Sequence, residues 1–164
     1  MAYDAIHPQT MPRNTDGESA NRVGRAGEHI VIAELLMAGH EAFMCEGKAP
    51  FDVLAVVGGR LVRIQVKTTS GFKQCPQRTH STPVYAFSAR KVGKLRRQGY
   101  KKGEADLVAY VALDRRAAAY LPAEKIAQST VLRIRAFEDQ YYCKTGMFFE
   151  DFPLSAALEG LDLG

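Results

Sequence analysis

Cysteines are few in this sequence, and long apolar runs are missing. Cys45, Cys75 and Cys143 are odd in number, lie far apart and form no CxxC pair, so neither a disulfide framework nor a cysteine zinc site is expected. No stretch approaches the roughly 18 consecutive apolar residues of a membrane span. The N-terminus also lacks the apolar segment of a secretory signal. We therefore expect a cytoplasmic protein that does not enter the membrane.

The composition is that of one folded domain. The chain has 164 residues, of which 46% are hydrophobic and 24% are charged. Residues 1–20 are polar and show no apolar period, so we expect a flexible N-terminal tail followed by a single domain over 21–164. The net charge of +4 only weakly favours an anionic partner.

The apolar pattern predicts a mixed α/β fold. Apolar residues recur at three- and four-residue steps over 21–38, which indicates a helix that Gly39 terminates. The runs 52–57 and 60–67 are nearly continuous in Val, Leu and Ile, which is typical of central strands covered on both faces. Further strands are expected at 41–45, 83–88, 106–113, 117–121 and 130–135, and short helices after 122 and at 155–159.

The pair Gly58-Gly59 predicts a two-residue hairpin turn, because both positions tolerate positive φ. Counting back from this turn places Asp52 directly across from Gln65. Side chains alternate along a strand, so Lys67 projects from the same face as Gln65. The hairpin therefore predicts a cluster of a carboxylate, an amide and an ammonium group.

The first helix is expected to add Glu28, which lies on the same stripe as Val31 and Leu35. A carboxylate in an apolar stripe is costly unless it is paired or bound to a metal, so Glu28 is expected to meet Asp52. Glu34 is predicted to point elsewhere, into solvent. The alternative is that Glu28 is a buried acid in a salt bridge with Lys67.

Glu28, Asp52 and Gln65 together offer the hard oxygen ligands that Mg²⁺ prefers, and Mn²⁺ is a possible substitute. Such a site suits phosphodiester hydrolysis, in which the ion neutralises charge on the phosphate. Lys67 is expected to orient or deprotonate the attacking water, or to stabilise the pentacoordinate phosphate, and the sequence does not separate these roles.

These motifs resemble the PD-(D/E)xK nuclease superfamily. The resemblance covers about 23–126 and consists of Gly27-Glu28, Pro50-Phe51-Asp52 and Gln65-Val66-Lys67. Their order resembles the α-β-β-β-α-β topology of that superfamily, which implies a restriction-endonuclease-like core with a central mixed β-sheet flanked by helices. The resemblance also implies a metal-dependent endonuclease.

Within the superfamily, the Gln-x-Lys form is most similar to the branch that includes group I intron homing endonucleases. Thr68-Thr69 and the later segments 106–111 and 120–122 add to this likeness. Holliday-junction resolvases are more distantly similar. Most of the superfamily has Asp or Glu where this chain has Gln65. A neutral amide keeps a carbonyl oxygen but removes one negative charge, so weaker Mg²⁺ binding is expected.

Basic residues gather after the strand at 83–88. The segment 90–102 holds seven basic residues and no acid, which predicts a phosphate-binding helix; a solvated helix face is the alternative. Asp106 is expected to cap a strand, to pair with an arginine or to support the site, and Arg22, Arg25 and Lys48 are interpreted as surface charges, the first two within reach of a phosphate. The predicted nucleic-acid contacts are Lys73, Arg78, Arg90, Lys91, Lys94, Arg96, Arg97, Lys101 and Lys102.

The sequence therefore predicts an endonuclease that acts on DNA, with RNA as an open alternative. A homodimer or a higher symmetric oligomer is expected, because one site cuts one strand and duplex cleavage needs two. Two other classes remain open. A catalytically inactive nucleic-acid-binding or oligomerisation module would bind DNA without metal, and an interaction scaffold would bind neither.

Overall fold

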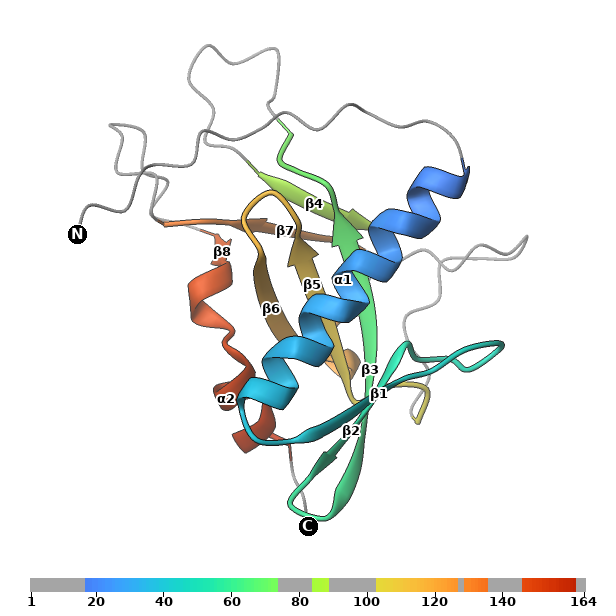
Figure 1. Ribbon diagram of the computed structural model, residues 1–164. Helices are drawn as coiled ribbons and strands as arrows, with labels where there is room; N and C mark the ends of the chain where they lie inside the picture. The colour runs from blue at the N-terminus through green and yellow to red at the C-terminus, as the bar shows by residue number, and fades with distance from the viewer. Residues whose placement is uncertain (1–16, 74–83, 89–102, 127–128, 136–145, 162–164) are drawn as a thin grey trace, which may run out of the picture.

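The computed structural model of the chain describes residues 17–73, 84–88, 103–126, 129–135 and 146–161. Two α-helices, two short 3-10 helices and eight strands make up this part (Figure 1). They are α1 (Gly17–Met37), β1 (Glu41–Met44), β2 (Val53–Val57), β3 (Arg60–Thr69), β4 (Tyr85–Ser88), β5 (Leu107–Ala112), β6 (Ala117–Pro122), η1 (Ala123–Lys125), β7 (Ser129–Arg133), β8 (Met147–Phe148), η2 (Phe149–Asp151) and α2 (Leu154–Glu159).

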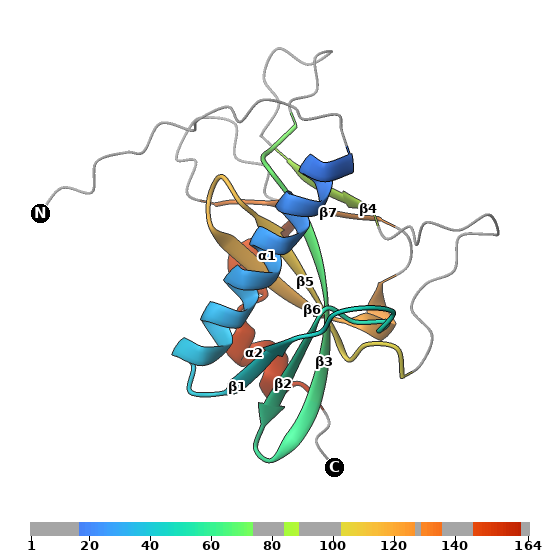
Figure 2. The same ribbon diagram turned by 45° about the vertical axis from the view of Figure 1, so that its right-hand side comes forward.

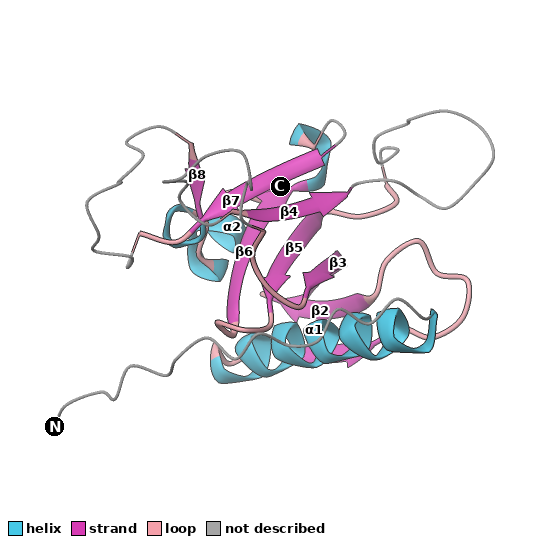
Figure 3. Cartoon of the chain, turned by 90° about the horizontal axis from the view of Figure 1, so that it is seen from above, coloured by secondary structure: helices cyan, strands magenta, loops and turns pink. Residues whose placement is uncertain are grey.

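Five strands form a central sheet in the order β1-β2-β3-β5-β6. The pair β3 and β5 is parallel and the other pairs are antiparallel, so the sheet is mixed, as predicted. Helix α1 lies across one face of this sheet, where Val31 and Leu35 are fully buried (Figures 1 and 3). Helix α2 packs beside β6, and its Ala157 and Leu158 join the same apolar cluster.

A second sheet of three strands, in the order β4-β7-β8, was not predicted. Its side chains form another apolar cluster with residues of β5 and β6 such as Tyr110 and Leu121. Strand β5 is therefore covered by α1 on one face and by the small sheet on the other (Figure 2). All six of its residues are buried for this reason.

The prediction that the strands at 52–57 and 60–67 are covered on both faces is wrong. Burial alternates along β2, and in β3 only Val62, Ile64 and Val66 are buried. These buried side chains face α1. The opposite face of this hairpin is more open, and Leu61 there is 65% exposed. The strand that is covered on both faces is β5, which lies inside the sheet and is not part of the hairpin.

The predicted hairpin register is confirmed. Gly58 and Gly59 have φ of 56° and 80°, and Val57 pairs with Arg60. Pairing in this register continues to Val53 and Ile64, and the main-chain N–H of Asp52 then donates a 3.0 Å hydrogen bond to the carbonyl of Ile64, one residue before the counted partner Gln65. A carboxylate and an amide predicted to be neighbours are thus brought to the same end of the hairpin.

Two details of α1 differ from the prediction. The helix begins at Gly17, four residues before Asn21, and Ser19 of this added turn is buried. Glu34 is not solvated, because it accepts a 2.6 Å hydrogen bond from the hydroxyl of Tyr120. Burial and the charge of Glu34 raise the pKa of Tyr120, so this phenol stays protonated.

In the described part of the chain, no helix combines the length and apolar character that a membrane crossing needs.

Candidate active site

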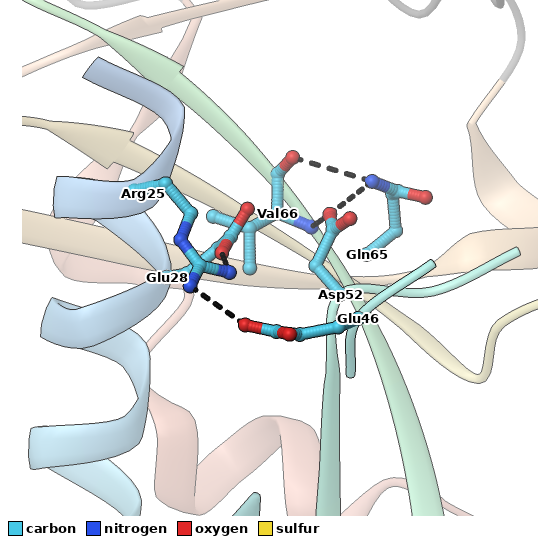
Figure 4. Close-up of polar contacts among 6 residues, drawn as sticks. All are labelled: Arg25, Glu28, Glu46, Asp52, Gln65 and Val66. Carbon is cyan, nitrogen blue, oxygen red and sulfur yellow. Dashed lines mark hydrogen bonds and ion pairs between the residues drawn. The ribbon is translucent and has the colours of Figure 1, made fainter. Parts of the chain in front are cut away.

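Asp52 is held rigidly at the start of β2. Besides the hydrogen bond from its N–H to Ile64, its carbonyl accepts one from the N–H of Cys45 at 2.8 Å. Its Oδ2 accepts hydrogen bonds from the main-chain N–H of Val66, at 2.7 Å, and from the side-chain amide of Gln65 (Figure 4). Both the backbone and the carboxylate of Asp52 are therefore fixed by the neighbouring strands.

Gln65 lies on the face predicted from the hairpin, beside Asp52. Its Nε2 also donates a 3.4 Å hydrogen bond to the carbonyl of Val66. A half-turn of the amide exchanges Nε2 and Oε1, so the same side chain presents a carbonyl oxygen when a cation lies next to Asp52. The Gln65 amide therefore offers a donor to the metal-free carboxylate and an acceptor to a metal.

Glu28 approaches this pair from α1, and its side chain is 17% exposed. Burial raises its pKa, and the negative charge of Asp52 raises it further. Burial also raises the pKa of Asp52, although the Val66 hydrogen bond, the charge of Lys67 and the Gln65 amide act in the opposite direction. Two partly buried carboxylates thus repel each other, and a cation between them relieves both the desolvation and the repulsion.

The donor set fits a hard divalent cation. It consists of two carboxylates and one amide oxygen, ligands of the kind that Mg²⁺ and Mn²⁺ accept. Because the third group is a neutral amide, no cluster of three His, Cys, Asp or Glu side chains occurs among the described residues. The site carries one negative charge fewer than a set of three carboxylates would.

Lys67 completes the predicted group of four. It lies on β3, two residues beyond Gln65, in a strand that pairs in parallel with β5. Its ammonium is close enough to Asp52 to lower the pKa of that carboxyl. The arrangement therefore joins a place for a cation to a neighbouring ammonium, which is what water attack on a phosphodiester needs.

Arg25, interpreted as a surface charge within reach of a phosphate, is half exposed and lies beside Glu28. Its Nη1 lies 3.5 Å from a carboxylate oxygen of Glu28, and its Nη2 donates a 3.0 Å hydrogen bond to Glu46 (Figure 4). The spacing of Arg25 and Glu28, three residues apart on a helix, is a signal for such a pair. Nothing in the sequence pointed to Glu46, which follows β1.

Asp106 pairs with an arginine, one of the three roles weighed for it. Its carboxylate accepts hydrogen bonds from Arg63, at 2.8 Å from Nη2, 3.0 Å from Nε and 2.7 Å from the main-chain N–H. Burial alone would raise the pKa of Asp106, but these hydrogen bonds hold it below its ordinary value. The pair ties the beginning of β5 to the middle of β3 and contributes no group to the cluster around Asp52.

Of the predicted nucleic-acid contacts, only Lys73 lies within the described residues. It is exposed, and its N–H donates a 2.8 Å hydrogen bond to the carbonyl of Val84. The others, Arg78, Arg90, Lys91, Lys94, Arg96, Arg97, Lys101 and Lys102, lie outside the described residues. Cys75 and Cys143 also lie outside them, and Cys45 is a free thiol.

Comparisons with known proteins agree with this fold. No curated protein matches the chain. A solved structure of a bacterial homing endonuclease, I-Ssp6803I, is similar in fold, with a TM-score of 0.62 over 86% of this chain and 93% of that chain. The two are 15% identical, so this likeness concerns the fold. A family model described as PD-(D/E)XK endonuclease matches residues 19–147, well over half of the sequence. The chain therefore belongs to the PD-(D/E)XK endonuclease family.

Proposed function

We propose that this chain is a Mg²⁺-dependent endonuclease that hydrolyses phosphodiester bonds of DNA. The observation that carries the proposal is the convergence of Glu28 and Asp52, two carboxylates of raised pKa, next to Gln65 and Lys67. Both pKa values stay raised although Arg25 lies beside Glu28 and Lys67 lies near Asp52, so a cation between the two carboxylates would be favourable. Family membership supports a nuclease that uses a divalent metal.

In this proposal Glu28, Asp52 and Gln65 hold the metal through oxygen atoms. A bound Mg²⁺ would neutralise the charge that builds on the phosphate and lower the pKa of water. The Val66 N–H fixes one Asp52 oxygen, so Asp52 presents the other in a set direction. Lys67 orients the attacking water or stabilises the charged phosphate. Mn²⁺ is the expected substitute, since it accepts the same ligands.

The proposed DNA contacts are the basic residues that follow Lys67 in the sequence. Lys73 lies four residues after the end of β3 and is exposed. The segment 90–102 supplies most of the other positive charges. Contacts of this kind go to phosphates and carry no sequence preference. A symmetric oligomer is proposed from mechanism, because one site cuts one strand. The cytoplasmic location remains a prediction from the sequence.

One feature favours the second candidate, a DNA-binding module without catalysis. Gln65 is neutral, so the site holds a divalent ion with less charge than a set of three carboxylates. Such a module would bind DNA with the salt sensitivity of phosphate contacts but would not cut it.

Cleavage of a substrate panel tests the proposal. Linear duplex, supercoiled plasmid, single-stranded DNA, a four-way junction and RNA are incubated with Mg²⁺, Mn²⁺ or a chelator. We expect the wild type to cut at least one DNA form with either metal, and neither the chelated protein nor Asp52→Ala to cut. Salt-sensitive DNA binding without cleavage in either metal would establish the inactive module instead, and RNA cleavage alone would change the substrate.

A further inference from the structure

Arg25 joins α1 to the loop between β1 and β2 at the edge of the candidate site. Its two terminal nitrogens have different partners, since Nη1 faces Glu28 at 3.5 Å and Nη2 donates to Glu46 at 3.0 Å. The Arg25 side chain is 48% exposed and that of Glu46 is 77% exposed. The guanidinium therefore lies between an inner carboxylate and an outer one (Figure 4).

The inner contact is the longer of the two. Nη1 of Arg25 lies 3.5 Å from the carboxylate of Glu28, whereas Nη2 donates a 3.0 Å hydrogen bond to Glu46. In the metal-free site the negative charge of Asp52 disfavours the ionised form of Glu28, and the positive charge of Arg25 favours it. A divalent ion bound by Glu28 would take over this role. The Nη1 side of Arg25 would then face a site that already has its cation.

We propose that Arg25 changes partners: it pairs with Glu28 in the metal-free site and binds a phosphate oxygen of the nucleic acid once Glu28 holds the metal. Glu46 keeps the guanidinium at the edge of the site in both states. The inference rests on the proposed function. A guanidinium has five donors in a planar fork, so one edge can stay on Glu46 while the other binds a phosphate.

This exchange predicts effects of opposite sign for Arg25→Gln. Without Arg25, no positive charge repels the metal ion and no guanidinium competes with it for the Glu28 carboxylate. Metal binding therefore becomes tighter. Removing the phosphate contact weakens DNA binding. A residue that only held α1 and the loop together would weaken both on substitution, so the signs separate the two roles.

Arg60→Gln is a matched control, because it makes the same change of charge at the hairpin end of β3. At about 3.3 Å per residue, Arg60 lies on the order of 20 Å along the strand from Lys67. Circular dichroism of both variants verifies that α1 is intact. Calorimetric titration with Mn²⁺ then measures metal affinity without any cleavage. Fluorescence anisotropy of a labelled duplex in Mg²⁺ measures DNA affinity, with every protein in a Lys67→Ala background to prevent cutting.

For Arg25→Gln we expect Mn²⁺ affinity to rise about threefold to tenfold and DNA affinity to fall about tenfold, with a salt slope reduced by roughly one. Arg60→Gln should leave Mn²⁺ affinity unchanged. The exchange is overturned, while the proposed function stands, if the parent protein binds both ligands and Arg25→Gln has the same affinities as Arg60→Gln. It is likewise overturned if Arg25→Gln binds both Mn²⁺ and DNA more weakly. A parent that binds neither Mn²⁺ nor DNA overturns the proposed function, and this inference with it.

Discussion

Gly27 of α1 lies directly against Thr68 of β3. A Cβ on Gly27 would be 2.9 Å from the Cβ of Thr68 and 2.8 Å from its Cγ2, and it would overlap the hydroxyl. The Thr68 hydroxyl is buried and has no hydrogen-bond partner among the residues that the structure describes, consistent with a close approach of the helix backbone. This contact sets the distance between α1 and β3, and thus the reach of Glu28 toward Asp52.

Gly27→Ala should therefore damage the candidate site through the position of the helix. The Cβ of Thr68 is fixed to the strand, so rotation of the side chain does not relieve the overlap and α1 must move. Overpacking of this kind costs about 1–3 kcal/mol of unfolding free energy. We also expect weaker Mn²⁺ binding, because Glu28 is the next residue. Urea unfolding and calorimetry measure the two effects.

Gly24→Ala is the control, since a Cβ there meets nothing within 4 Å. Alanine is about 1 kcal/mol more favourable than glycine inside a helix, so this variant should be more stable and bind metal normally. Adding Thr68→Ala to Gly27→Ala removes the hydroxyl and the Cγ2 and should restore part of the lost affinity. Equal behaviour of the two single variants would show that the close contact has no such role.

Gln65→Glu tests whether Gln65 contributes to metal binding. A third carboxylate adds a negative charge beside Asp52 and Glu28, so the metal-free protein should unfold at a lower temperature. The same charge should strengthen Mg²⁺ binding by about tenfold, or about 1.4 kcal/mol. We expect Mg²⁺ to raise the melting temperature more for Gln65→Glu than for the wild type. An equal rise for both would place Gln65 outside the metal site.

Asp52→Asn should stabilise the metal-free protein at neutral pH while it abolishes metal binding. Burial raises the pKa of Asp52, so ionisation of this carboxyl costs more in the folded chain than in the unfolded one. That cost is complete above the folded pKa and vanishes below the unfolded value of about 4. Removing it should add roughly 0.5–2 kcal/mol at pH 7.5.

The stabilising effect of Asp52→Asn should depend on pH. The difference in unfolding free energy between Asp52→Asn and the wild type should shrink as the pH falls from 7.5 toward 4, because protonation of the wild-type carboxyl removes the cost of its ionisation. Asp106, whose pKa is lowered, loses its stabilising effect only as the pH falls below about 4, and it is present in both proteins, so its effect cancels. A difference that stays constant from pH 7.5 to pH 4 would mean that ionisation of Asp52 is not its cause.

The hydrogen bond from Tyr120 to Glu34 predicts a stability effect remote from the candidate site. Tyr120→Phe removes a donor to a carboxylate, which should cost about 1.5–3 kcal/mol. Tyr110→Phe is the matched control, because the Tyr110 hydroxyl accepts a 2.8 Å hydrogen bond from Thr130, and such neutral bonds contribute about 0.5–1.5 kcal/mol. Denaturant unfolding should rank Tyr120→Phe as the more damaging change, with metal affinity normal in both.

Local rules predicted the hairpin and the site because they act over short distances. The glycine pair fixed the turn, the turn fixed the register, and the register brought Asp52 to Gln65. Glu28 lies on the apolar stripe of α1 that packs on the sheet, so it comes close to Asp52. Each step needed only the period of a strand or a helix.

The rest depended on which surfaces meet in three dimensions. Glu34 looked solvated because its partner, Tyr120, is distant in the sequence. The strands β2 and β3 looked fully covered, but the covering sheet of β4, β7 and β8 packs on β5 and β6 instead. Arg25 resembled any exposed arginine until the loop with Glu46 folded beside it. Pairings of this kind leave no periodic pattern in the sequence.

Single-turnover cleavage by Lys67→Ala tests the central claim most directly. Each protein is mixed separately, in excess, with an end-labelled DNA substrate and Mg²⁺, after calorimetry has shown that both proteins bind Mn²⁺. The account predicts that Lys67→Ala binds metal and DNA but cuts at least about 100-fold more slowly, the usual effect of losing a general acid–base group. Cleavage at the wild-type rate would contradict the assignment of this site as the nuclease centre.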